Sequence, residues 1–90
     1  MEGYKLKEPN DNIETWYREA HGCMIERRVH RGLPLSTLTV SRSLVTTKDN
    51  KFGHLLLCFT ADSEEAADAV AADIDARWPA IVAAALEVKP

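Results

Sequence analysis

Two histidines and two cysteines are the side chains of this sequence best suited to chemistry, because imidazole nitrogens and thiolates are ligands that zinc prefers. His21 and Cys23 are two residues apart, close enough to share one ion. His54 and Cys58 are four residues apart in a predicted strand, which separates them by about 13 Å. That pair could supply only one ligand, so the sequence predicts no metal site and no cofactor.

The remaining reactive side chains do not indicate a catalytic centre. Cys23 alternates with Ile25 in an apolar pattern, which favours a buried structural thiol over a nucleophile. Asp68 and Asp75 share a predicted helix face with Glu64, as the solvated acids of an amphipathic helix do. The sequence has no glycine-rich phosphate loop and no nucleophile elbow. We therefore expect no enzymatic activity.

Composition predicts an ordinary globular chain. Its 90 residues are 46% hydrophobic and 28% charged, which fits one domain, with residues 1–12 as an N-terminal arm. No run approaches the roughly 20 apolar residues that span a bilayer, and the N-terminus lacks the apolar stretch of a signal peptide. Cys23 and Cys58 are too few for a disulfide scaffold. We expect a cytoplasmic protein with both thiols reduced and buried.

Charge is distributed unevenly along the chain. Residues 23–51 carry six basic and two acidic side chains, a net +4, whereas residues 52–90 carry two basic and seven acidic ones, a net −5. The basic segment offers a possible anion or nucleic-acid contact through Arg27, Arg28, Arg31 and Arg42. Single-stranded nucleic acid also needs aromatic platforms among the cations, and Trp16 and Tyr17 are not interleaved with these arginines. Nucleic-acid binding is therefore the alternative rather than the first hypothesis.

Alternating patterns predict three strands, at residues 23–30, 36–47 and 52–60. The third is apolar on both faces, which is typical of a central or doubly covered strand. Tyr4 to Lys7 suits a short edge strand, and residues 13–21 fit either two helical turns or a strand.

A long helix is predicted over residues 62–88. Asp62 and Glu65 have the spacing of a capping box at its start. Val70, Ile74 and Trp78 fall on one face, which would cover the sheet. Pro79 removes one backbone hydrogen bond and crowds the preceding turn, so we expect the helix to kink or break there.

These elements predict an α+β fold, an antiparallel meander of three strands, or four with the N-terminal segment, packed on one face by the C-terminal helix. Beyond Pro79 the apolar residues occupy more of the helix than one sheet contact can cover. We expect them to meet the N-terminal aromatics or a second copy of the chain. A membrane-surface role is disfavoured, because the polar face of the helix is acidic. The predicted partner-binding residues are Trp16, Tyr17, Trp78, Ile81, Val82 and Leu86.

The sequence thus predicts a non-catalytic interaction or accessory protein that acts as a homodimer. The first alternative is the nucleic-acid-binding module described above. The second is a small-ligand protein with a pocket between helix and sheet, near His54, Cys58 or Trp78.

Overall fold

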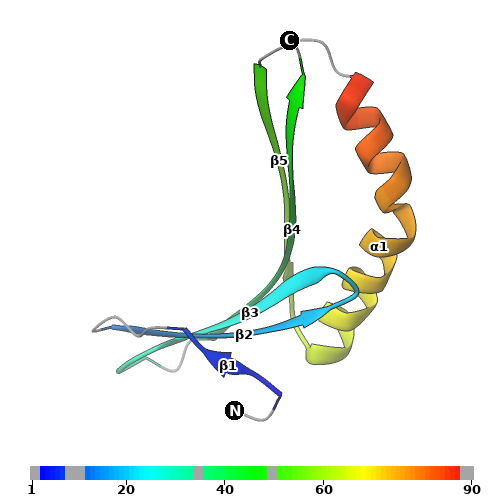
Figure 1. Ribbon diagram of the computed structural model, residues 1–90. Helices are drawn as coiled ribbons and strands as arrows, with labels where there is room; N and C mark the ends of the chain where they lie inside the picture. Colours follow the sequence, from blue (N-terminus) through cyan, green and yellow to red (C-terminus); the bar gives the residue numbers. More distant parts are fainter. Residues whose placement is uncertain (1–2, 8–11, 34–35, 49–50, 88–90) are drawn as a thin grey trace.

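The computed structural model describes residues 3–7, 12–33, 36–48 and 51–87; the side chains of residues 46–48, 51–53, 86 and 87 are not part of that description. Within these residues one antiparallel sheet has the order β1-β2-β3-β4-β5, and one helix packs against it (Figure 1). The elements are β1 (Lys5–Leu6), β2 (Ile13–Ala20), β3 (Cys23–His30), β4 (Ser36–Lys48), β5 (Lys51–Ala61) and α1 (Glu64–Glu87). The α+β meander is confirmed, with five strands where three or four were predicted.

The segment that fitted either helix or strand forms β2, because a tight turn joins it to β3. Ala20 lies opposite Cys23, so the turn contains only His21 and Gly22. Both have positive φ, 51° and 74°, as a type I′ hairpin turn requires. The eight cross-strand pairs that follow place Trp16 and Tyr17 on opposite faces of the sheet.

The core lies between the helix and the two middle strands. Buried residues of β3 and β4 alternate with exposed or half-buried ones, and Ile25 and Val40 face each other with no exposed surface. Small side chains on α1, Ala67 and Ala71, are also fully buried, which lets the helix approach the sheet closely. The buried cluster consists of Cys23, Ile25, Leu38, Val40, Ala67, Ala71 and Ile74.

The helix differs from its prediction at two points. Its N-cap is Ser63 rather than Asp62, because the Ser63 hydroxyl accepts a hydrogen bond from the Ala66 amide at 3.0 Å. The helix also continues through Pro79 to Glu87, so of the two outcomes expected at Pro79, a kink or a break, the break is excluded. Pro79 and Asp75 both lie on the exposed side, where water can bond the Asp75 carbonyl that lacks its helical partner.

The last two strands extend beyond the rest of the sheet. β3 pairs with β4 only as far as Ser41, so residues 42–48 of β4 and 51–57 of β5 form a two-stranded β4–β5 arm. The arm bends away from β1, β2 and β3, and the second half of α1 runs beside it (Figure 1). Of the two strands of the arm, β5 lies on the side away from α1.

This arm makes the molecule elongated. Its radius of gyration is 15.5 Å, with extents of 47 × 27 × 18 Å, whereas about 12 Å is expected for a compact domain of this length. The accessible surface is 6547 Å², against about 5,200 Å² for a typical monomer of this mass. The single chain therefore exposes roughly 1,300 Å² more surface than a compact fold of its size.

Candidate functional site

The outer side of β5 is a long open sheet edge. Among the described residues no strand pairs with it, because the sheet ends at β5. The prediction of a central or doubly covered strand is therefore wrong. A strand with apolar residues on both faces is usually buried between layers, but here the chain leaves β5 directly for α1, and α1 covers only one face of the sheet.

Apolar side chains are exposed along this edge and beside it. Leu56 is 59% exposed and Phe59 48% exposed on β5, and Val45 on the neighbouring β4 is 55% exposed. The cross-strand register puts Leu56 and Val45 on the face away from α1, and Phe59 on the other face at the margin of the sheet. We call this group, Val45, Leu56 and Phe59, the edge patch. Single exposed leucines are ordinary, but two large apolar side chains on an unpaired edge strand, with a third on the strand beside it, are not.

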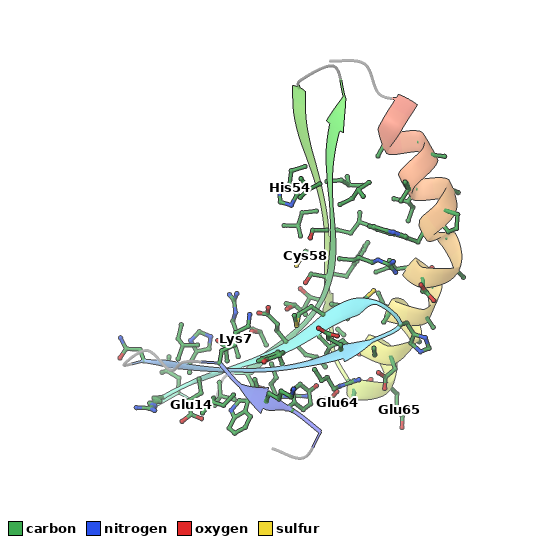
Figure 2. All side chains as sticks on the ribbon, in the orientation of Figure 1. Lys7, Glu14, His54, Cys58, Glu64 and Glu65 are labelled. Carbon is green, nitrogen blue, oxygen red and sulfur yellow. The ribbon has the colours of Figure 1, made fainter. Side chains whose placement is uncertain are left out.

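The thiol and imidazole of β5 share the face of Leu56. Figure 2 shows His54 and Cys58 projecting from β5 on the side away from α1. Cys58 is exposed, so the prediction that both cysteines are buried is correct only for Cys23. Alternation explains the error, because Leu57 packs against the core and its neighbours on either side must point outward.

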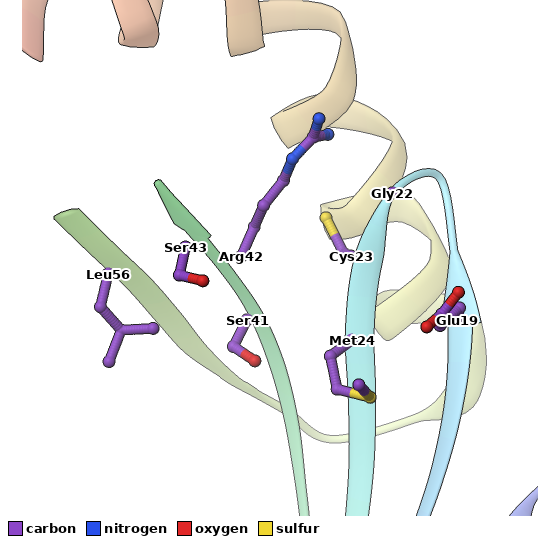
Figure 3. Close-up of a pocket in the computed structure, with 8 residues that line it drawn as sticks. All are labelled: Glu19, Gly22, Cys23, Met24, Ser41, Arg42, Ser43 and Leu56. Carbon is purple, nitrogen blue, oxygen red and sulfur yellow. The ribbon is translucent and has the colours of Figure 1, made fainter. Parts of the chain in front are cut away.

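A pocket of about 280 Å³ opens next to the edge patch, where β4 continues beyond the start of β3 (Figure 3). Most of its lining side chains lie on the sheet face away from α1, while Cys23 and Arg42 face the helix. No residue of α1 lines it, whereas the predicted pocket lay between helix and sheet. None of the three residues predicted to line a pocket contributes to this one. Its lining residues are Glu19, Gly22, Cys23, Met24, Ser41, Arg42, Ser43 and Leu56.

At the opposite end of the sheet, Glu64 in the first turn of α1 is the centre of an ion cluster. Its carboxylate accepts hydrogen bonds from Tyr4 at 2.6 Å, Arg18 at 2.9 Å and Arg27 at 3.0 Å. Arg18 also donates to Asp68 at 2.7 Å. We call these five residues the Glu64 cluster. It joins the N-terminal segment, β2 and β3 to the start of the helix.

Electrostatics in this cluster favour the charged carboxylate. Burial alone would raise the pKa of Glu64, but the hydrogen bonds from Tyr4, Arg18 and Arg27 outweigh it and lower the pKa to about 2. Burial and the hydrogen bond to Glu64 raise the pKa of Tyr4. Both pKa shifts result from burial and hydrogen bonds within the Glu64 cluster. Neither produces an acid or a base that titrates near neutral pH.

A second cluster holds the middle of the helix. The Arg42 guanidinium lies over the Trp78 ring, 4.1 Å from its centroid. It donates to Asp75 at 3.1 Å and to the His21 carbonyl at 3.3 Å. A Cβ atom on Gly22 would lie 2.8 Å from the Arg42 Nη1 atom, so the turn between β2 and β3 closes against this guanidinium. Arg42 thus joins β4, the hairpin turn and α1.

The four predicted anion-binding arginines do not form one patch. Arg27 and Arg42 face the helix and pair with Glu64 and Asp75. The other two bond acids of the sheet: Arg28 lies 3.6 Å from Glu26 on the opposite face, and Arg31 lies 3.2 Å from Glu14. Two of the four arginines thus pair with acids of the helix within the same chain.

The predicted partner-binding residues are also divided. Trp78 packs against the core under Arg42, and Ile81 and Val82 are half-buried on the part of α1 beside the arm. The side chain of Leu86 lies outside the described part of the structure. Trp16 pairs with Leu6 and Arg27 near the N-terminal edge, and Tyr17 lies under Lys7 on the other face. Figure 1 places these N-terminal strands at the opposite end of the molecule from the end of α1, so they do not cover it.

Among the described residues, no group of three or more His, Cys, Asp or Glu side chains could hold a metal ion. No helix in that part of the chain is long and apolar enough to cross a membrane.

Comparison with known proteins gave no relative: no protein-family model, curated protein or solved structure matches this chain.

The feature that sequence reasoning missed is the open edge itself. The uninterrupted apolar run Leu55 to Phe59 is visible in the sequence, but a run of this kind usually indicates a buried strand. The signal that could have corrected this is the order of elements, since the last strand of a simple meander lies at the edge of the sheet.

Proposed function

We propose that this chain is a non-catalytic protein-interaction protein that acts as a homodimer. The observation that carries the proposal is the edge patch on an unpaired strand. Monomeric proteins usually protect such edges with charge, proline or a covering segment. The described residues provide none of these along residues 54–61 of β5.

The size of the exposed surface supports the same function. A stable interface of ordinary size buries about 800 Å² on each partner. The excess of roughly 1,300 Å² over a compact monomer is sufficient for one such interface. Two copies would also convert an elongated chain into a more compact assembly.

The ionisable side chains support a structural rather than a catalytic role. Glu64, Arg18, Arg27, Arg42 and Asp75 pair with one another between sheet and helix. Each pair holds α1 against the sheet. A cytoplasmic location remains part of the proposal and is supported by the two free cysteines, which are typical of a reducing compartment.

Multi-angle light scattering of the purified chain over a range of concentrations tests this proposal. A species of twice the 10.0 kDa chain mass is expected, with dissociation on dilution. A mass of one chain at every concentration would contradict the homodimer.

A further inference from the structure

We propose that two copies join through their β5 edges, which pair antiparallel and form one continuous ten-stranded sheet. This inference rests on the proposed function and names the surface and the partner: the partner is a second copy of this chain. It differs from the helix-end interface that the sequence suggested, because the exposed apolar side chains of β5 lie on the sheet edge.

Backbone groups give the first argument. Every second residue of an edge strand directs its N–H and C=O groups away from the sheet, and these groups need partners. In β5 the open edge is eleven residues long, from Lys51 to Ala61. In a single chain only water can bond these outward groups. A second β5 would bond them through strand-to-strand hydrogen bonds.

The second argument is the absence of charged side chains along residues 52–61 of β5, which is compatible with pairing between two copies. Residues 52–61 contain no acidic side chain, no lysine and no arginine. Two copies of this stretch can therefore lie side by side without like charges meeting, although the whole chain carries a net charge of −3. Arg27 and Arg42, two of the basic side chains that could attract a charged partner, are already paired with Glu64 and Asp75.

Symmetry fixes the arrangement. A two-fold axis that joins two identical antiparallel edges stands perpendicular to the sheet, so both helices lie on the same face. Directly opposite residues must share a face, and side chains alternate along a strand. The axis therefore passes through a residue, and we place it at Leu57, one of the two central residues of the uncharged stretch 52–61.

The resulting pairs are apolar on both faces. Leu56 lies opposite the partner's Cys58 on the face away from α1. Leu55 lies opposite the partner's Phe59 on the helix side, where Leu57 meets its own copy. The two exposed residues of β5 in the edge patch, Leu56 and Phe59, thus each gain an apolar neighbour.

Disulfide trapping tests this pairing, because directly opposite residues have Cβ atoms close enough for a disulfide. The variant Leu56→Cys, with the native Cys58, should form a covalent dimer under mild oxidation that a reductant releases. Two controls should stay monomeric on a non-reducing gel: the wild type, whose Cys58 side chains lie two residues out of register, and Leu56→Cys with Cys58→Ser. Cys23 is buried and does not compete.

A second pair of cysteine positions keeps the test valid if the first variant does not fold. In a Cys58→Ser background, His54→Cys with Thr60→Cys occupies another set of opposite positions, and both residues are exposed. Covalent dimer from either pair, together with none from the controls, supports the inference.

The outcomes of these experiments distinguish a failure of the β5 pairing from a failure of the homodimer. A chain that is dimeric by light scattering but gives no covalent dimer from either pair would overturn the β5 pairing and leave the homodimer standing. Rapid disulfide formation between the Cys58 side chains of two wild-type chains would overturn the proposed pairing, because it would require a different register. A chain that is monomeric until a foreign protein strand is added would overturn both proposals.

Discussion

The two edges of the sheet are opposites in length and charge. β1 is two residues long, and Lys5 and Lys7 flank its one apolar residue, Leu6. β5 is eleven residues long and uncharged between Phe52 and Ala61. Short strands and lysines are common protection against edge-to-edge pairing. The β1 edge of this sheet is therefore protected against such pairing, and the β5 edge is not.

The same contrast holds for the attachment of each edge. The N-terminal segment next to β1 is held to the helix by charge, through Tyr4 and Glu64. β5 is held by apolar packing of Leu57 and Ala61 against the core. Salt and pH should therefore affect the attachment of the β1 edge. Apolar or charged substitutions should affect the β5 edge.

The largest effect is expected at the core that supports both edges. Ile25→Ala removes a side chain with no exposed surface between the sheet and α1. Deletions of this kind cost about 2 to 5 kcal/mol, a large part of the stability of a domain of this size. Urea unfolding followed by circular dichroism measures it. A cost below about 1 kcal/mol would contradict the packing described here.

A lysine on the open edge should have the next largest effect. Leu56→Lys places a charge where an apolar contact with the second copy is proposed, so we expect the dimer dissociation constant to rise at least about tenfold. Sedimentation measures that constant. The matched control is Leu6→Lys on β1, where the side chain is 44% exposed and dimerisation should be unchanged. Equal effects at both positions would remove the distinction between the edges.

A smaller effect is expected from Glu64→Gln near the protected β1 edge. Glu64 has a pKa of about 2 in the folded chain, below its ordinary value of 4.5. Its contribution is therefore fully present above pH 4.5 and is lost as the pH falls toward 2. The Glu64 side chain is 42% exposed, so solvent screening limits that contribution to about 1 kcal/mol.

Unfolding curves at several pH values check this prediction. The variant should be less stable at neutral pH and should lose less stability than the wild type between pH 4.5 and 2. Its dimer dissociation constant should match that of the wild type. Identical acid profiles for the two proteins would show that Glu64 is not held as described.

The smallest effect is expected from Tyr4→Phe. It removes the hydroxyl that donates to Glu64 at 2.6 Å and keeps the ring beneath Arg18. Loss of one partly exposed hydrogen bond costs about 0.5 kcal/mol, the low end of the usual range. Thermal unfolding should detect a small decrease in midpoint with no change in oligomeric state. An unchanged midpoint would mean that the N-terminal segment is not fixed by this contact.

Sequence patterns predicted the parts of the fold that depend on local periodicity. The alternation around Ile25 and Val40 placed both in the core, and the helical face containing Ile74 and Trp78 was correctly assigned to the sheet. Residues 13–21 remained ambiguous, because their helical and extended patterns are about equally good over so short a length. His21-Gly22 was the missed signal, since both residues accept the positive φ of a two-residue hairpin turn.

The sites could not be predicted in the same way, because they depend on contacts between distant residues. Tyr4 and Glu64 are 60 residues apart, and only the folded sheet brings them together. Arg27 and Arg42 were candidate anion ligands until α1 supplied their acidic partners. The prediction that β5 is a strand with apolar residues on both faces was correct. The composition of a strand does not say whether the strand beside it belongs to the same chain or to another copy.

Amide hydrogen exchange compares the two edges most directly. The central claim is that β5, and not β1, finds a partner in a second copy. Alternate amides between Gly53 and Ala61 should gain protection as the protein concentration rises through the dissociation constant, while the amides of Lys5 and Leu6 remain unchanged. A dimer in which the outward amides of β5 exchange as fast as in the single chain would contradict the account.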